Sequence, residues 1–450
     1  MGAEPPALSP CPIRFHRLVR DLAGSMPNAV FYDILGKDSA GYAQGEERID
    51  GVGPRLIVVC FICLGQGRDG KMGKETTRNS NFEFLRIVAM LAITLCHFVA
   101  RKYILSGDIP IRWISVMLVD FWGLGDCLFF GITSWYLCMS NPTGKKAFRR
   151  VWQLEKQLWF YAIGIFAVLA ILQFGFGLYP FFASKGALAK AGLSSVAPVI
   201  SELWWYPTAY VLFVLLHPFI NACLRACGER IHRGLALSAF AIWGVIPFFP
   251  LNMKLSVFLF LYQYVMLSYV RWYHDDLLRS RRLKTMLLAV GLGVGICFDS
   301  VMAVAGAIGK LGRNYTYMSQ PWSFPSLFVA LGLLMWAYQR EESHSKAINI
   351  MASATLAPYV ITKYTPLTLA VKHWIDELTA GMNAGFGLML NVVLILVMFM
   401  LCIAIDLVRQ ALFRVTVDRK PGAWFAVVWD CMENRAKPAI SEKWARIVQG

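Results

Sequence analysis

The chain has 450 residues, of which 57% are hydrophobic and only 16% are charged. Soluble globular proteins are about half apolar and about a quarter charged, so this composition excludes an ordinary soluble domain. The net charge of +16 is compatible with nucleic-acid binding. However, the cations lie in short segments between long apolar blocks, which is typical of membrane topology signals. No nucleic-acid partner is therefore expected.

The apolar blocks recur along most of the chain. Each has about 17–25 residues, enough for a helix to cross a hydrocarbon layer of about 30 Å. Backbone polar groups in lipid must be bonded within the segment, and the short alternating strands of a barrel are not seen in the sequence. We therefore predict an all-α polytopic membrane protein, a bundle of about ten transmembrane helices. The expected spans are residues 82–100, 112–138, 154–176, 204–224, 234–250, 254–273, 285–306, 322–338, 348–371 and 385–408.

The loops between these blocks differ in charge. If the segment before the first span is cytoplasmic, the loops on that side and the tail hold most of the cations. The opposite loops hold scattered ones such as Lys185, Lys254 and Lys310. This is the positive-inside pattern, so both termini are expected in the cytoplasm. The cations assigned to the cytoplasmic loops are Lys145, Lys146, Arg149, Arg150, Lys156, Arg225, Arg230, Arg233, Arg271, Arg279, Arg281, Arg282 and Lys284.

The two ends of the chain differ in composition from its middle. Residues 1–79 are rich in Gly, Pro and charge, and their one apolar run, 56–64, is too short to span. We expect them to be an N-terminal extension that is disordered or not native, with a natural start at Met72. Residues 80–410 are expected to form the transmembrane domain. Residues 411–450 are expected to form a basic cytoplasmic tail, either solvated or lying on an anionic membrane surface.

Most of the eleven cysteines lie singly inside apolar spans, where cysteine behaves as a small hydrophobe. Cys60 and Cys63 have a CxxC spacing, but no second Cys or His pair follows at zinc spacing. Neither a metal nor a disulfide framework is therefore expected.

The first span contains three ionisable residues, Glu83, Arg86 and His97. Arg86 and His97 are eleven residues apart, which on a helix is within about 20° of three full turns and gives a rise of about 16 Å. Both side chains therefore project from one face at different depths, and Glu83 can pair with Arg86. Ionisable groups inside a span are functional candidates. The alternatives are an anchoring role for Arg86 at the membrane surface and a packing role for His97.

The sequence Glu83-Phe-Leu-Arg86-Ile-Val-Ala-Met, followed by His97, resembles the first helix of the acyltransferase 3 family. These are bacterial membrane enzymes, typified by polysaccharide and lipopolysaccharide O-acetyltransferases. The resemblance covers residues 80–410 and continues in the family's order. It includes Phe129-Phe130 with Ser134 and Tyr136, the stretch Lys145–Arg150 with Gln157–Tyr161, the stretch Trp204–Asn221, and Ile348–Ile361.

The chain departs from the family pattern at three positions. Trp135 replaces a Gly, Thr362 stands where many relatives have His, and the spacing from Asp126 to the two Phe differs by one residue. An inactive or differently specific member would be consistent with these departures.

The resemblance implies an O-acyltransferase in the bacterial plasma membrane. The donor would be an acyl-CoA, with acetyl-CoA expected, and the acceptor a hydroxyl of an envelope glycan or lipid-linked sugar. No bound cofactor is expected. His97 is the candidate base, and Arg86 can bind the phosphates or pantetheine arm of the donor. Further candidates for the donor or acceptor site are Glu83, Ser134, Asp126, Arg149, Arg150, Trp204 and Tyr210.

Two other classes of function fit the same composition. A transporter or flippase would also have about ten spans and intramembrane charges, and it would show inverted repeats with broken helices in both halves. A membrane sensor or binding domain of the same fold would lack activity. Labelled acetyl-CoA with candidate glycans distinguishes all three.

Overall fold

The structure is a computed structural model that describes residues 78–140, 143–246, 256–309, 323–420, 422 and 424–431. All of these lie within one unit, Cys60–Gly450. The proposed N-terminal extension, apart from its last two residues, and the end of the tail lie outside the described residues. The described residues are all-helical, as the sequence predicts.

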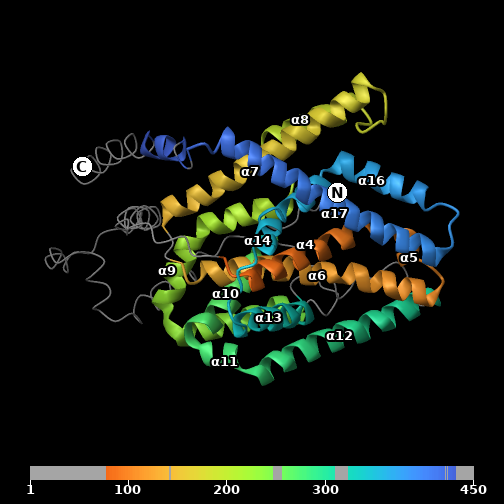
Figure 1. Cartoon of the computed structure of the whole chain (residues 1–450). Coiled ribbons are helices and arrows are strands. Elements are labelled where there is room, and N and C mark those ends of the chain that lie inside the picture. Colours follow the sequence, from red (N-terminus) through yellow and green to blue (C-terminus); the bar gives the residue numbers. More distant parts are fainter. Residues whose placement is uncertain are drawn as a thin grey trace, which may run out of the picture. The chain divides into compact units, whose positions relative to one another are not determined.

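Figure 1 labels the helices in their order along the chain. Two short π-helical segments, η1 (Ile171–Gly175) and η2 (Phe240–Val245), extend α7 and α9. The helices are α4 (Ser80–Phe98), α5 (Arg101–Ile104), α6 (Ile109–Leu137), α7 (Gly144–Ala170), α8 (Lys185–Val196), α9 (Trp205–Ala239), α10 (Ser256–Tyr273), α11 (Asp275–Arg279), α12 (Arg281–Ala307), α13 (Phe324–Gln339), α14 (Lys346–Ser353), α15 (Leu356–Thr362), α16 (Thr365–Leu378) and α17 (Ala384–Val415).

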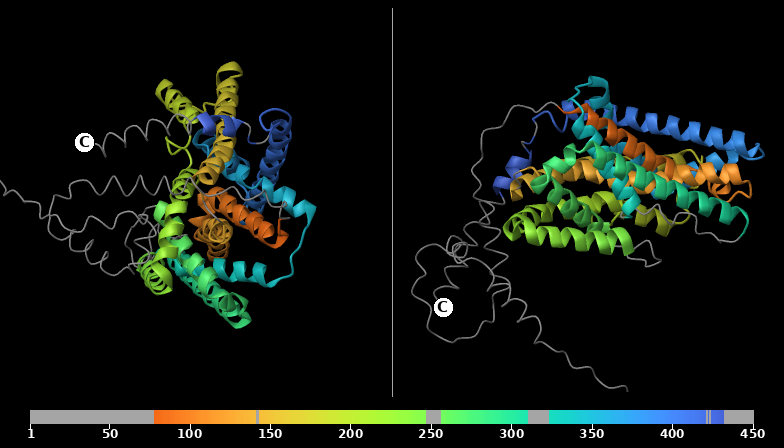
Figure 2. Two further views of the ribbon diagram at one scale, coloured as in Figure 1. Left: turned by 90° about the vertical axis from the view of Figure 1, so that its left-hand side faces the viewer. Right: turned by 90° about the horizontal axis from the view of Figure 1, so that it is seen from below.

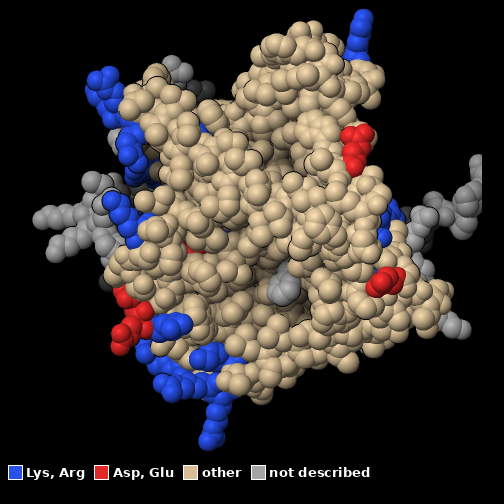
Figure 3. All heavy atoms as spheres, turned by 45° about the vertical axis from the view of Figure 1, so that its right-hand side comes forward, with Lys and Arg blue, Asp and Glu red and all other residues tan. Residues whose placement is uncertain are grey.

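Six helices in the described part of the chain are long and apolar enough to cross a membrane. This supports a multi-pass membrane protein. The six are Ser80–Phe98, Ile109–Leu137, Gly144–Gly175, Trp205–Val245, Arg281–Ala307 and Ala384–Val415. Figure 3 shows one face on which Lys and Arg gather at the margins while the middle consists almost wholly of uncharged residues.

The expected span 204–224 and most of the expected span 234–250 fall in the single long element Trp205–Val245, and residues 247–250 lie outside the described residues. This element is interrupted at Gly228, whose φ of 72° and ψ of 173° are not helical. That backbone conformation is essentially restricted to glycine. Gly228 thus divides the element between the two expected spans.

The expected span 348–371 differs more from the structure, because it is not one helix. It is divided among α14, α15 and α16. Pro358 lies in the first turn of α15 and Pro366 in the first turn of α16. Proline has no N–H to bond to the preceding turn, so it is tolerated in the first turn of a helix and disrupts a helix interior. Each proline therefore lies where a new helix starts. The last helix, α17, is also longer than expected and continues past 410 to Val415.

Helix α4 packs most extensively against α6, and α6 also contacts α10, α12 and α13 (Figure 2). The close approach of α4 and α6 requires Gly125, because a Cβ there would lie 2.7 Å from the carbonyl oxygen of Ala89. Small residues allow such approaches between membrane helices.

Side chains hold both ends of α4. The Asn79 side chain accepts a hydrogen bond from the N–H of Asn81 at the start. At the far end, the buried amide of Asn391 on α17 accepts from the N–H of Ala100 and donates to the carbonyl of Phe98. These bonds satisfy backbone groups that helix ends leave free, so the position of α4 is fixed at both ends.

Candidate functional site

At the start of α4, the Arg86 guanidinium donates two hydrogen bonds to the Glu83 carboxylate, at 3.3 and 3.1 Å. The sequence prediction of this pair is confirmed. Glu83 is buried, whereas Arg86 remains partly exposed. The carboxylate therefore fixes the position of the guanidinium while leaving donors free for a ligand.

Arg86 lines a cavity of about 370 Å³, here called the inner cavity. Its walls come from α4, α6, α7, α9, α14 and α15. The wall residues that matter for binding are Arg78, Arg86, Arg150, Gln157, Tyr206 and Tyr210. Among its described wall residues there are three arginines and no carboxylate, so the cavity is suited to an anion.

Tyr210 lies close enough to Arg86 and Arg150 to interact electrostatically with both. This places the two guanidinium groups, from α4 and α7, on the same part of the inner cavity. The sequence predicted each of these three residues as a candidate separately, and the structure brings them together.

A chain of aromatic rings leads from the inner cavity to His97. The ring centroid of Tyr206, in the cavity wall, lies 6.2 Å from that of Tyr359 on α15. The Tyr359 ring lies 6.4 Å from the His97 imidazole. The Nδ1 of His97 and the hydroxyl of Tyr206 are buried, and neither has a hydrogen-bond partner in the described part of the chain. Most buried polar atoms in proteins have a hydrogen-bond partner, and an ordered water or a bound ligand would supply one here.

Charged residues surround this end of the site. Lys363 and Lys372 interact electrostatically with His97. Asp126, which is buried, interacts with Tyr206, Tyr359 and Lys363. Asp126 was predicted from the sequence, and the structure places it beside the ring chain rather than in the cavity wall.

A second and larger cavity, of about 900 Å³, is here called the outer cavity. It shares the wall residues Arg78, Gln153, Gln157 and Ser353 with the inner cavity. Its cationic wall residues are Arg78, Arg149, Lys156, Arg409, Arg414 and Lys420. Of the two neighbouring arginines predicted from the sequence, Arg149 therefore lines the outer cavity and Arg150 the inner one.

Five predicted site residues lie outside both cavity walls: Glu83, His97, Asp126, Ser134 and Trp204. Ser134 is fully buried, and its neighbour Thr133 lines the inner cavity instead. Trp204 is buried immediately before α9, two residues ahead of Tyr206.

The departures from the family pattern at Trp135 and Thr362 also lie outside the cavity walls. The Trp135 ring lies 3.9 Å from the Arg271 guanidinium in a cation–π contact. Thr362 donates a hydrogen bond to the carbonyl of Pro358, at 2.5 Å. Both residues therefore have local partners.

Asp406 is a buried residue near the site that sequence reasoning missed. Its carboxylate accepts hydrogen bonds from Tyr161 at 2.5 Å and Arg409 at 2.7 Å. Gln157 and Gln410 also donate to it. An acidic and a basic residue three positions apart within an apolar span were the available signal. The network joins α7 to α17 and holds Gln157 and Arg409 in the cavity walls.

Compared with known proteins, the chain matches no family model, no curated protein and no solved structure. The described residues include no group of three or more His, Cys, Asp or Glu that could hold a metal ion. The residues of the site therefore define its chemical character: two basic cavities, and a half-buried histidine that lines neither cavity and is separated from the inner one by the rings of Tyr206 and Tyr359.

Proposed function

We propose that the protein is a membrane-bound O-acyltransferase. It would transfer an acetyl or other small acyl group from cytoplasmic acyl-CoA to a hydroxyl of an envelope or exported glycan. One observation carries the proposal: Arg86 and Arg150 line the inner cavity together with Tyr206, and the Tyr206 ring contacts Tyr359, whose ring in turn contacts His97. The resemblance of the α4 sequence to acyltransferase 3 helices agrees with this arrangement.

The residues of the site suit acyl transfer in distinct ways. Arg86 and Arg150 would bind donor phosphates, since guanidinium groups match phosphate geometry. His97 would accept the proton of the acceptor hydroxyl as that oxygen attacks the thioester carbon. Lys363 supplies positive charge near the developing oxyanion. The C–S bond then breaks, and the thiolate leaving group takes the proton from His97, which yields the ester and free CoA.

The burial of the site supports the same reaction. Water competes with a sugar hydroxyl as acceptor, so an acyltransferase requires a site from which water is excluded. Tyr206 and Tyr359 are both buried between the inner cavity and His97. We propose that the acceptor, a glycan or lipid-linked sugar, approaches His97 from the far side of the bacterial plasma membrane.

The test is a transfer assay with the purified protein in lipid. Acetyl-CoA labelled in the acetyl group should deliver label to a glycan acceptor, and free CoA should appear in equal amount. The matched control is His97→Gln, which keeps a polar side chain but removes the base. Equal label transfer by the wild type and His97→Gln would contradict the proposal.

A transporter or flippase is the second candidate, and the division of residues 346–378 into three short helices favours it. Discontinuous helices near mid-membrane are common in transporters. The same assay separates the two functions. A transporter would move an intact glycan or CoA across proteoliposomes without forming an ester.

A further inference from the structure

The outer cavity is closed on one side by the segment that follows α17. This segment packs on the N-terminal half of α7 through three contacts. Lys156 forms an ion pair with Asp418. Arg149 lies beside Gly422, where a Cβ would be 3.4 Å from its guanidinium. The rings of Phe148 and Trp429 are 5.7 Å apart. The described part of the tail is therefore docked on the helical bundle.

The charges of the outer cavity are not balanced. Its described walls contain six cations, against one carboxylate, Asp418. Lys156 is paired with Asp418, and Arg409 is paired with Asp406. The other four cations, Arg78, Arg149, Arg414 and Lys420, form no ion pair with any described residue. Unpaired cations converging on one cavity indicate a ligand that carries several negative charges.

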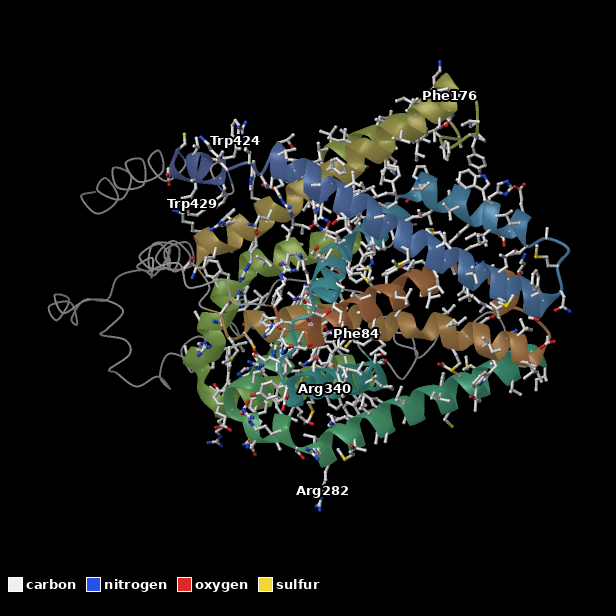
Figure 4. All side chains as sticks on the ribbon, viewed as in Figure 1. Phe84, Phe176, Arg282, Arg340, Trp424 and Trp429 are labelled. Atoms are coloured by element: carbon white, nitrogen blue, oxygen red, sulfur yellow. The ribbon has the colours of Figure 1, made fainter. Side chains whose placement is uncertain are left out.

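Aromatic side chains line the same space. Trp152 and Phe413 come from α7 and α17, and Trp424 and Phe425 from the helical residues 424–431. Figure 4 shows Trp424 and Trp429 on this short helix beside the end of α17. Trp424 is 69% exposed although it lies in a cavity wall. An exposed indole next to cations suits stacking of a nucleic base.

We propose that the outer cavity binds a nucleoside bisphosphate group, with the segment after α17 as one wall of the site. This inference rests on the proposed function, because that group would be the nucleotide end of the acyl-CoA donor. The volume of about 900 Å³ lies within the range of small-molecule sites. The four wall residues shared with the inner cavity place the remainder of the donor beside Arg86.

The experiment measures binding of adenosine 3′,5′-bisphosphate to the full chain in nanodiscs of neutral phosphatidylcholine, by titration calorimetry. Arg414→Gln and Lys420→Gln should each raise Kd about five- to tenfold, through loss of one charge-assisted hydrogen bond. Arg419→Gln is the matched control, because Arg419 is adjacent to Lys420 and exposed but does not line the cavity. Its Kd should stay within about twofold of the wild type.

Three further arms identify the ligand chemistry. Adenosine 5′-monophosphate should bind more weakly than the bisphosphate. Trp424→Ala should weaken both nucleotides by the same factor, because it removes stacking and not charge. Adding anionic phosphatidylglycerol to the nanodiscs should leave the nucleotide affinity unchanged.

Three results would overturn the assignment: no nucleotide binding in neutral nanodiscs, wild-type affinity in both charge variants, or displacement of the nucleotide by phosphatidylglycerol. The last would identify a lipid-headgroup site instead. If instead only the proposed acyltransferase function is wrong, the protein should bind the bisphosphate normally and transfer no acetyl label.

Discussion

Arg86 and His97 share one helix and divide the proposed chemistry between them. His97→Ala should lower the rate of transfer by about 100-fold or more, as expected when a general base is removed. The protein should remain folded, because the Nδ1 of His97 makes no hydrogen bond to a described residue that would be lost. Single-turnover kinetics with labelled acetyl-CoA measure the effect, and wild-type rates in a correctly inserted variant would leave His97 as a packing residue.

Arg86→Lys should act on donor binding instead. Lysine keeps the charge but loses the planar fork that bonds both Glu83 and a phosphate. The KM for acetyl-CoA should rise while kcat changes little.

If Arg86 and His97 act as one unit, the double variant should be little worse than His97→Ala alone. Strictly additive losses would show that the two residues act independently.

Asp406 is expected to stabilise the fold, because it neutralises the buried Arg409. Asp406→Asn would leave the Arg409 guanidinium buried without its counter-ion, which costs about 3–5 kcal/mol when a buried pair is broken. Asp418→Asn is the control, because its pair with Lys156 is more exposed and exposed pairs contribute about 0–1 kcal/mol. Thermal unfolding in detergent should show a large loss for the first variant and a small one for the second. Equal losses would contradict this difference.

At the scale of the elements, the contact of α4 with α6 depends on Gly125. Gly125→Ala places a methyl group against the α4 backbone at Ala89 and should destabilise the protein by about 1–3 kcal/mol. Gly164→Ala, in α7, meets nothing within 4 Å and should be neutral or stabilise the helix by about 0.5–1 kcal/mol. Unfolding temperatures of the two variants, measured side by side, check the difference. A Gly125→Ala variant with the wild-type unfolding temperature would mean that α4 and α6 can move apart with no loss of stability.

The sequence predicts the elements well where a long apolar run is uninterrupted, as in α4, α6 and α12. The prediction of a single helix at residues 348–371 is wrong, because hydropathy is an average over the side chains of a segment. Such an average does not detect a proline, which lacks the backbone N–H that a continuous helix needs. Pro358 and Pro366 can be seen in the sequence. However, each affects the backbone only locally, and the mean hydropathy of the segment remains high.

The contacts of the candidate site are likewise predictable from the sequence in part. The pairing of Glu83 with Arg86 follows from helical spacing. The contact of Tyr206 with Tyr359 joins α9 to α15, and no local pattern specifies it. The docking of the segment after α17 on α7 likewise depends on tertiary contacts at Lys156 and Phe148.

At the scale of the whole molecule, the cations expected in the cytoplasm gather at one end of the bundle. Arg149, Arg409 and Arg414 line one cavity, and Arg271 packs on Trp135, whose ring contacts Phe82 at the start of α4. This arrangement agrees with the positive-inside rule. The side of the membrane is a prediction.

Cysteine labelling in intact cells tests this orientation. In a cysteine-free background, Lys145→Cys should be protected from an impermeant maleimide, and Lys185→Cys should react. The two residues match in type and both lie exposed in the first turn of a helix, α7 and α8 respectively. The reverse labelling pattern would place both termini outside.

The division of residues 346–378 into α14, α15 and α16 has a consequence for biogenesis. These helices have 8, 7 and 14 residues, and each is too short to cross about 30 Å of hydrocarbon. A segment of this kind cannot leave the translocon as an independent span. It must enter the bilayer against α4, which is made before it, and α17, which is made after it. Tyr359 and Lys363 would therefore reach their final positions beside His97 only when the last helix has been made, so a chain truncated before α17 would insert into the membrane without an assembled site.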